Sequence, residues 1–160
     1  MKTAIVTGCA GGIGFATVKK LTAAGMKVLG MDICPSADVT EKFMDFGGCF
    51  KYFSGNLADS ADRKALLNEA KAFLGRIDIL VNVAGVAPKV RNDILEMTEE
   101  SYDRVMNINA KGTMFLSQII AKEMLSNELC DGIRGYIVNI SSMSAYTSST
   151  SRGEYCISKA

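Results

Sequence analysis

Short runs of apolar and β-branched residues alternate along the chain with longer segments in which apolar residues recur at helical spacing. Five such runs predict β-strands, at Thr3–Thr7, Lys27–Met31, Cys49–Phe53, Ile79–Asn82 and Tyr136–Ile140. The other segments predict helices at Gly12–Ala24, Pro35–Phe46, Ser60–Phe73 and Thr98–Glu128, and, after a polar loop at Ser141–Ser151, a short helix with Tyr155 and Lys159. Because strands and helices alternate without hairpin signals, the pattern predicts an α/β fold. We expect a doubly wound parallel sheet in three α/β/α layers.

Local signals refine these boundaries. Ser60 is a typical N-cap residue, and Gly25 suits the C-terminal cap of the first helix. Ile79–Asn82 is apolar on both faces, as expected of a central parallel strand.

The length of 160 residues suits one domain, spanning residues 1–160. The hydrophobic fraction is 48%, the charged fraction 22% and the net charge +1, with the two signs well mixed. These values favour neither nucleic acid nor a membrane surface as a partner. No apolar run reaches the roughly 18 residues of a transmembrane helix, and the N-terminus does not resemble a signal peptide. We therefore expect a cytoplasmic protein.

Histidine is absent, and the five cysteines are scattered without CxxC pairs. This composition argues against a disulfide framework and a zinc site, so we expect free thiols and no metal. It also excludes Ser-His-Asp and Cys-His catalysis. Any acid or base must be Tyr, Lys, Asp, Glu or Cys.

A glycine-rich turn, Thr7–Gly14, joins the first predicted strand to the first helix. Glycines at this place allow a sharp turn and a close approach of pyrophosphate to the helix N-terminus. Asp32 follows the second strand, 18 residues past Gly14. Its carboxylate suits the ribose hydroxyls of adenosine and repels a 2′-phosphate, and Cys9, Ala10 and Gly11 supply no cation. These features favour NAD over NADP. A simple tight turn and a solvated carboxylate are the alternatives.

The second half of the chain carries further polar marks: Asn82-Val83-Ala84-Gly85, Asn109, Ser142 and Tyr155-x-x-x-Lys159. Tyr155 and Lys159 share one helix face, and a neighbouring ammonium favours a phenolate, so this pair supplies an acid/base without histidine. Ser142 can hydrogen-bond a substrate oxygen where charge develops. Each mark alone has a structural explanation, but their combination in this order is far less common by chance.

In these motifs the chain resembles the short-chain dehydrogenase/reductase family, from Thr3 to its last residue. The resemblance implies a Rossmann-like fold and a catalytic tetrad of Asn109, Ser142, Tyr155 and Lys159. In this tetrad Tyr155 exchanges the proton, Lys159 holds the nicotinamide ribose, Ser142 orients the substrate and Asn109 positions a water for proton relay. The cofactor-binding residues implied are Gly8, Gly12, Ile13, Gly14, Asp32, Asn56, Leu57, Asn82, Ala84, Gly85, Tyr155 and Lys159.

Three departures from the family pattern stand out. Position 56 is Asn where the family usually has Asp, and position 83 is Val where Asn is frequent. The sequence also ends one residue after Lys159, whereas family members continue with two more strands and a substrate loop. We therefore expect residues 1–160 to be the N-terminal part of a longer enzyme, with the C-terminal strands absent and little turnover by this span alone.

The function expected is an NAD-dependent interconversion of a secondary alcohol and a ketone. An NADP-linked 3-oxoacyl-carrier-protein reductase is one alternative, and a non-catalytic dinucleotide-binding module is another. Met143, Tyr146 and Arg152, together with Val86–Lys89, are candidates to line the substrate pocket. Arg152 either meets an anionic substrate group or is solvated. The apolar surplus of the helix Thr98–Glu128 suits either core burial or a homodimer or homotetramer interface, as is common in the family.

Overall fold

The computed structural model describes residues 1–147 and 149–160, so Ser148 of the predicted polar loop lies outside the described residues. The described chain forms one sheet of five parallel strands in the order β3-β2-β1-β4-β5. The strands are β1 (Thr3–Thr7), β2 (Lys27–Asp32), β3 (Phe50–Ser54), β4 (Ile79–Asn82) and β5 (Tyr136–Asn139). Ile5 lies opposite Leu29 on one side and Leu80 on the other, which fixes the central register.

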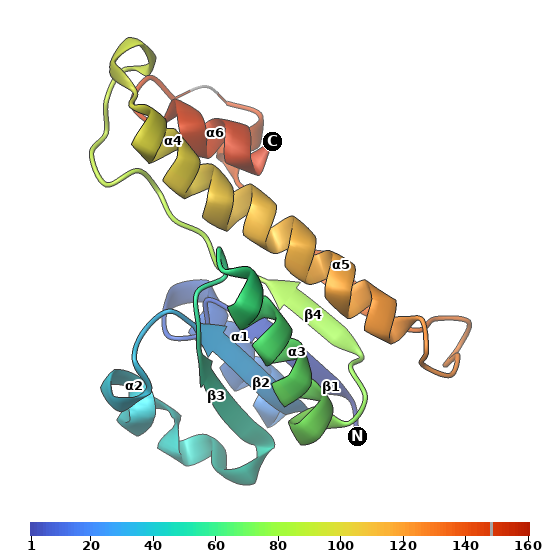
Figure 1. Ribbon diagram of the computed structural model, residues 1–160. Helices are drawn as coiled ribbons and strands as arrows, with labels where there is room; N and C mark the ends of the chain where they lie inside the picture. The colour runs from blue at the N-terminus through green and yellow to red at the C-terminus, as the bar shows by residue number, and fades with distance from the viewer. Residues whose placement is uncertain (148) are drawn as a thin grey trace.

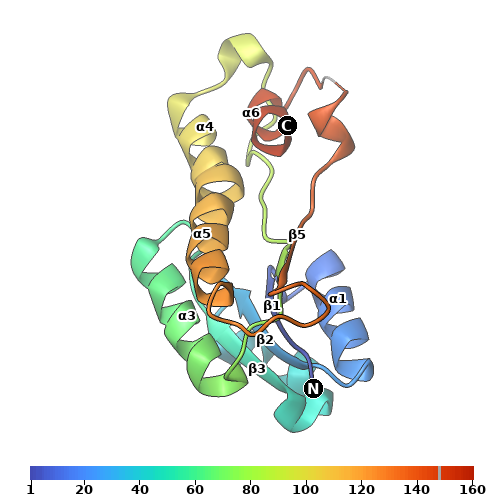
Figure 2. The ribbon, with the colours of Figure 1, turned by 90° about the vertical axis from the view of Figure 1, so that its right-hand side faces the viewer.

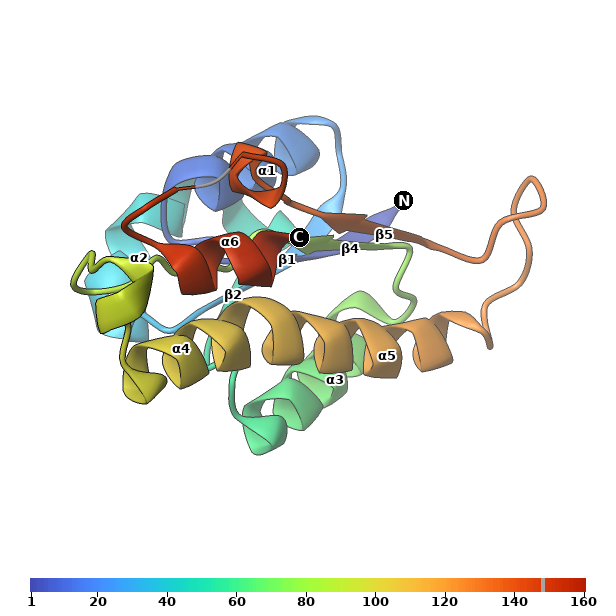
Figure 3. The ribbon, with the colours of Figure 1, turned by 90° about the horizontal axis from the view of Figure 1, so that it is seen from above.

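Helices cover both faces of this sheet (Figure 1). They are α1 (Gly12–Ala23), α2 (Ser36–Phe43), α3 (Ser60–Leu74), α4 (Glu99–Met106), α5 (Thr113–Met124) and α6 (Gly153–Lys159). Viewed from above, the strands lie between a layer with α1 and a layer with α3, α4 and α5 (Figure 3). This arrangement confirms the predicted Rossmann-like, three-layer α/β/α class.

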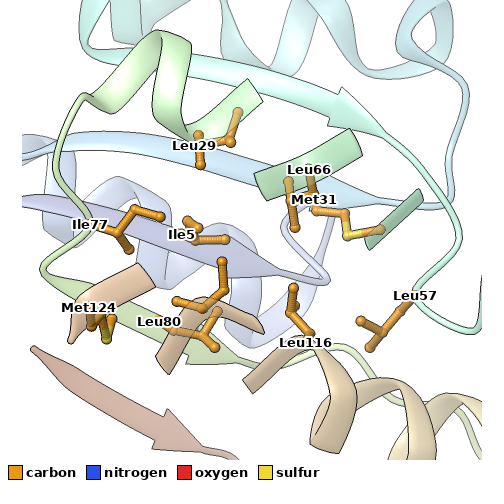
Figure 4. Packing of buried hydrophobic residues seen from close by; sticks show 11 residues of the cluster. Ile5, Leu29, Met31, Leu57, Leu66, Ile77, Leu80, Leu116 and Met124 are labelled. Atoms are coloured by element: carbon orange, nitrogen blue, oxygen red, sulfur yellow. The ribbon is translucent and has the colours of Figure 1, made fainter. Parts of the chain in front are cut away.

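Two apolar clusters, one on each face of the sheet, form the core. Residues of β1 alternate between them: Ile5 packs with Leu116 of α5 and Leu66 of α3 (Figure 4), whereas Val6 packs with Val18 of α1. All five residues of β1 are buried, as in a strand covered on both faces. In β4, for which the sequence predicted this, Leu80, Val81 and Asn82 are buried and Ile79 is half-buried.

The prediction of one unbroken α-helix over Thr98–Glu128 is wrong. Thr98 is the N-cap, since its hydroxyl accepts a hydrogen bond from Ser101 N at 3.2 Å, and the helix ends at Met124. Between α4 and α5 a π-helical segment, Asn107–Gly112, widens the helix. Gly112 faces the Leu57 carbonyl there so closely that a Cβ would lie 2.8 Å from its oxygen. Hydrophobic spacing does not reveal such a local change of hydrogen bonding.

The structure also differs from the prediction at the ends of two other helices. Asp59, not Ser60, caps α3, because its carboxylate accepts a hydrogen bond from Ala61 N at 2.7 Å. The helix predicted at Pro35–Phe46 is shorter, since α2 ends at Phe43 and a 3₁₀ segment, Met44–Cys49, follows. Gly25 follows the first helix with a left-handed φ of 77°, as its predicted capping position requires. Among the described helices, none has the length and apolar character needed to cross a membrane.

Candidate functional site

A cavity of about 440 Å³ opens at the carboxyl ends of the strands, where the strand order reverses between β1 and β4. Ligands of open parallel sheets bind at this kind of switch point. Eight of the predicted cofactor-binding residues line it: Gly8, Ile13, Gly14, Asp32, Asn56, Leu57, Ala84 and Gly85. The other four, Gly12, Asn82, Tyr155 and Lys159, do not line it.

Two glycines of the turn between β1 and α1 have no space for a side chain. A Cβ on Gly14 would lie 1.9 Å from the Gly8 carbonyl oxygen. Gly8 has a φ of 68°, and a Cβ there would lie 2.9 Å from the backbone of Ala84. Gly12 differs, since its φ is 49° but nothing surrounds its Cβ position. No side chain caps α1 at Gly11, so the first N–H groups of this helix are available to an anion.

Asp32 lines the cavity and also shapes the turn. Its Oδ2 accepts a hydrogen bond from Ala10 N at 2.9 Å, and its Oδ1 accepts a longer one from Cys34 N at 3.3 Å. Lys42 of α2 donates to the carbonyl oxygen of the same Ala10 at 2.5 Å. Cys9, Ala10 and Gly11 supply no cation, as the sequence shows, but α2 brings the Lys42 ammonium to the turn from a distant part of the chain.

The loop after β3 carries the next two predicted residues. Asn56 Oδ1 accepts a hydrogen bond from Ala58 N at 3.0 Å, and the Asn56 N–H donates to Asp62 at 2.7 Å. Leu57 is buried, and its carbonyl accepts a hydrogen bond from Arg63 at 2.6 Å. These contacts fix the loop at the rim of the cavity.

Asn82, at the end of β4, lies in the interior behind the cavity. Its Nδ2 donates to Ser117 of α5 and Asn139 of β5, each at 2.9 Å, while its Oδ1 is buried without a partner among the described residues. It lines a second, more polar cavity of about 260 Å³, together with Asn109 and Lys159. Asn82 thus ties β4 to its neighbours.

Asn109 lies buried in the π-helical segment and joins two elements. Its Oδ1 accepts a hydrogen bond from Val86 N at 2.8 Å, and its Nδ2 donates to Val86 O and to Ser158 Oγ, each at 2.9 Å. Ser158 in turn donates to the carbonyl of Tyr155 at 2.9 Å. Asn109 therefore fixes α6 against the loop after β4, and one lone pair of its Oδ1 stays available.

Tyr155 and Lys159 lie on the same side of α6, with the Lys159 ammonium 6.0 Å from the centre of the Tyr155 ring. Lys159 also donates to the Ile140 carbonyl at 2.9 Å. Burial lowers the pKa of Lys159 below its usual range. A second cation, Arg152, lies 5.6 Å from the centre of the same ring. Two positive charges therefore flank Tyr155.

A long segment leads from β5 to α6 (Figure 2). Ser142 belongs to this segment, three residues after the end of β5 at Asn139. Its hydroxyl oxygen accepts a hydrogen bond from Ser144 N at 3.1 Å and caps a short 3₁₀ turn, Met143–Ala145. Ser142 lines neither of the two cavities, and among the described residues no hydrogen bond joins it to Tyr155. Its hydroxyl proton remains available to a substrate oxygen.

Glu154 is a residue that sequence reasoning missed. It is only 3% exposed, and its carboxylate accepts a hydrogen bond from the Ser101 hydroxyl at 2.5 Å. This contact anchors α6 to α4, the helix beside it (Figure 1). Nothing in the sequence except its position before Tyr155 pointed to Glu154.

Comparisons with known proteins agree with this geometry. Residues 2–160 match the family described as short chain dehydrogenase. The 2-dehydro-3-deoxy-D-gluconate 5-dehydrogenase of Dickeya dadantii is 34% identical over 99% of this chain and 60% of its own length. The 3-hydroxyacyl-CoA dehydrogenase type-2 of Drosophila melanogaster is 35% identical over 98% of this chain and 63% of its own.

A solved structure is similarly close. The 3-oxoacyl-[acyl-carrier protein] reductase of Brucella melitensis, in complex with NAD, superposes with a TM-score of 0.88 at 34% identity. The match covers 99% of this chain and 62% of that one. The chain thus spans about 60% of the length of the curated relatives it matches.

Proposed function

Because the chain belongs to the short-chain dehydrogenase family, we propose that it carries the active site of an NAD-dependent oxidoreductase that interconverts a secondary alcohol and a ketone. The observation that carries this proposal is the position of Gly85. This glycine lines the larger cavity, and a Cβ on it would lie 3.3 Å from both Asn109 Oδ1 and Lys159 Nζ. The larger cavity and the side chains of Asn109 and Lys159 therefore meet at one residue.

The residues of the larger cavity fit a dinucleotide. The backbone packing at Gly8 and Gly14 forms a cradle that a Cβ would fill, and the uncapped N-terminus of α1 suits pyrophosphate. Asp32, Asn56 and Leu57 also line this cavity. We assign Asp32 to the adenosine ribose and Asn56 and Leu57 to the adenine, as the family resemblance implies. A bound nicotinamide supplies or accepts the hydride.

In this proposal Tyr155 donates its hydroxyl proton to the substrate oxygen during reduction and accepts it during oxidation. The Lys159 ammonium stabilises the phenolate that forms. Ser142 donates a hydrogen bond to the same substrate oxygen, because its own oxygen already accepts from Ser144. Asn109 fixes α6 and keeps one lone pair for a relay water.

The NAD preference rests on Asp32, and one observation favours the NADP-linked reductase instead: Lys42 lies beside the turn. Titration of the full-length protein with both cofactors tests this choice. We expect a lower Kd for NAD than for NADP. Asp32→Ala should lower the ratio of the two Kd values, NADP over NAD, at least about tenfold, since the repulsion between the carboxylate and the 2′-phosphate disappears. Preference for NADP in the unmodified protein, reduced by Lys42→Met, would support the alternative.

We also propose that residues 1–160 belong to a single NAD-binding domain, and that the protein is a homodimer or homotetramer in the cytoplasm. Met114 and Phe115 of α5 support this interface, because they are 62% and 43% exposed. Val105, Leu116 and Ile120 are buried and serve the core instead. Light scattering tests the assembly: Phe115→Asp should lower the measured mass, and a monomeric unmodified protein would contradict the proposal.

A further inference from the structure

Arg152 is held against the proposed acid/base rather than free in solvent. Its guanidinium lies 5.6 Å from the centre of the Tyr155 ring, within the range of a cation–π contact. Its Nε donates to Ser149 Oγ at 3.2 Å, and the side chain is partly buried. These contacts fix the guanidinium beside the aromatic ring of Tyr155.

The charge of Arg152 is not neutralised within the described part of the chain. No carboxylate oxygen of the described residues lies within 4.0 Å of it. Glu154, two residues away, is buried and directed to Ser101 of α4. The two terminal NH₂ groups of Arg152 make no hydrogen bond to a described side chain or carbonyl. A partly desolvated guanidinium without an anion is costly, and its planar fork matches a carboxylate.

We propose that Arg152 binds a carboxylate of the substrate, so that the substrate class is a hydroxy acid and its oxo-acid counterpart. This inference rests on the proposed function, because it needs Tyr155 at the reacting oxygen. The closeness of Arg152 to the tyrosine ring requires the carboxylate to lie within a few carbon atoms of the carbon that exchanges the hydride. A cation at this position holds the substrate by two parallel hydrogen bonds and orients the reacting carbon.

Paired substrates test the inference in the full-length protein with NAD. Each pair consists of an acid and a neutral counterpart: lactate and its methyl ester, 3-hydroxybutyrate and its methyl ester, and D-gluconate and D-sorbitol. The variants are Arg152→Gln, which removes the charge, and Arg152→Lys, which keeps the charge but loses the fork. Arg134→Gln, at the opposite end of the sheet beside β5, is the matched control. Calorimetric affinities for the oxo-acid counterparts in the presence of NAD give a readout that does not depend on turnover, because an oxo acid and NAD together have no hydride to transfer.

We expect the unmodified protein to use the acid of at least one pair with the higher kcat/KM. Arg152→Gln should lower the acid-to-neutral ratio of kcat/KM about 10–100-fold and weaken binding of the oxo acid similarly, as for the loss of a charge-assisted bidentate contact. Arg152→Lys should give an intermediate ratio, and Arg134→Gln should keep the ratio of the unmodified protein.

Two results would overturn the inference alone. One is a higher kcat/KM for the neutral compound than for the acid in every pair. The other is an equal fall of both members in Arg152→Gln, since Arg152 would then act on Tyr155 and not on the substrate. Absence of turnover with every member of the panel would instead count against the proposed function itself.

Discussion

Replacement of Gly14 by alanine perturbs the turn that the account assigns to the cofactor. A Cβ at this position would lie 1.9 Å from the Gly8 carbonyl oxygen, whereas an ordinary contact of carbon with oxygen is about 3.3 Å. The carbonyl, or α1, must therefore move by about 1.4 Å, the difference between these two distances. The atoms that clash belong to backbone, so no side chain can rotate away.

The cost of such overpacking is about 1–3 kcal/mol. For a protein of this size each kcal/mol lowers the melting temperature by about 2–4 °C. The displacement also moves the N–H groups at the start of α1, so the Kd for NAD should rise about 10–100-fold. Thermal unfolding and calorimetric titration with NAD measure the two effects separately.

Gly48→Ala is the matched control, because nothing lies within 4 Å of its Cβ position and its φ is not in the left-handed region. This variant should melt within about 2 °C of the unmodified protein and bind NAD as well. The reasoning would be refuted if Gly14→Ala kept both the melting temperature and the NAD affinity of the control.

Substitutions at two further residues, Asp78 and Glu154, test the electrostatics of the fold and the anchoring of α6. Although burial raises the pKa of Asp78, hydrogen bonds from Arg76 and Thr3 outweigh this and hold it below its usual range. The stability this carboxylate adds is therefore present above the unfolded pKa and lost as the pH falls through the folded one. At pH 7 the free energy of unfolding of Asp78→Asn should be about 1 kcal/mol lower than that of the unmodified protein. Chemical denaturation should show this difference shrinking as the pH falls below about 4. A difference independent of pH would contradict a stabilising role of the ionised Asp78 carboxylate. Glu154→Ala should lower kcat about tenfold, because the hydrogen bond from Ser101 that anchors α6 is lost. Glu154→Gln can still accept this hydrogen bond and should keep most of the activity. Equal losses of kcat in both variants would argue against a positioning role of Glu154.

Much of the architecture was predictable because strand burial leaves a strong signal. The strands at Thr3–Thr7 and Ile79–Asn82 were predicted with the bounds that the structure has, since both faces of each are apolar. The π-helical segment at Asn107–Gly112 was not, because hydrophobic spacing does not distinguish it from an α-helix. The close approach of Gly112 to Leu57 was not predictable either, since it joins distant parts of the chain.

In the candidate site, too, some features were predictable from the sequence and others depend on contacts between distant parts of the chain. The spacing of Tyr155 and Lys159 indicated that they share a helix face. The position of Asp32 at the carboxyl end of a predicted parallel strand indicated that it would lie at the ligand-binding edge of the sheet. The positions of Lys42 beside the turn and of Arg152 beside the tyrosine ring depend on how loops and helices pack. Sequence neighbours carry no information on such contacts, so a tertiary structure was needed to find them.

Tyr155 is the proposed acid/base of a hydride-transfer site at the carboxyl ends of the strands. Tyr155→Phe in the full-length protein removes only the hydroxyl. The account predicts that NAD affinity stays within about threefold while kcat for alcohol oxidation falls at least about 100-fold, as expected for loss of general acid/base catalysis. Unchanged turnover in Tyr155→Phe would contradict this role of Tyr155. Binding of NAD by the unmodified protein without any turnover would also contradict it, and would point to a non-catalytic dinucleotide-binding module.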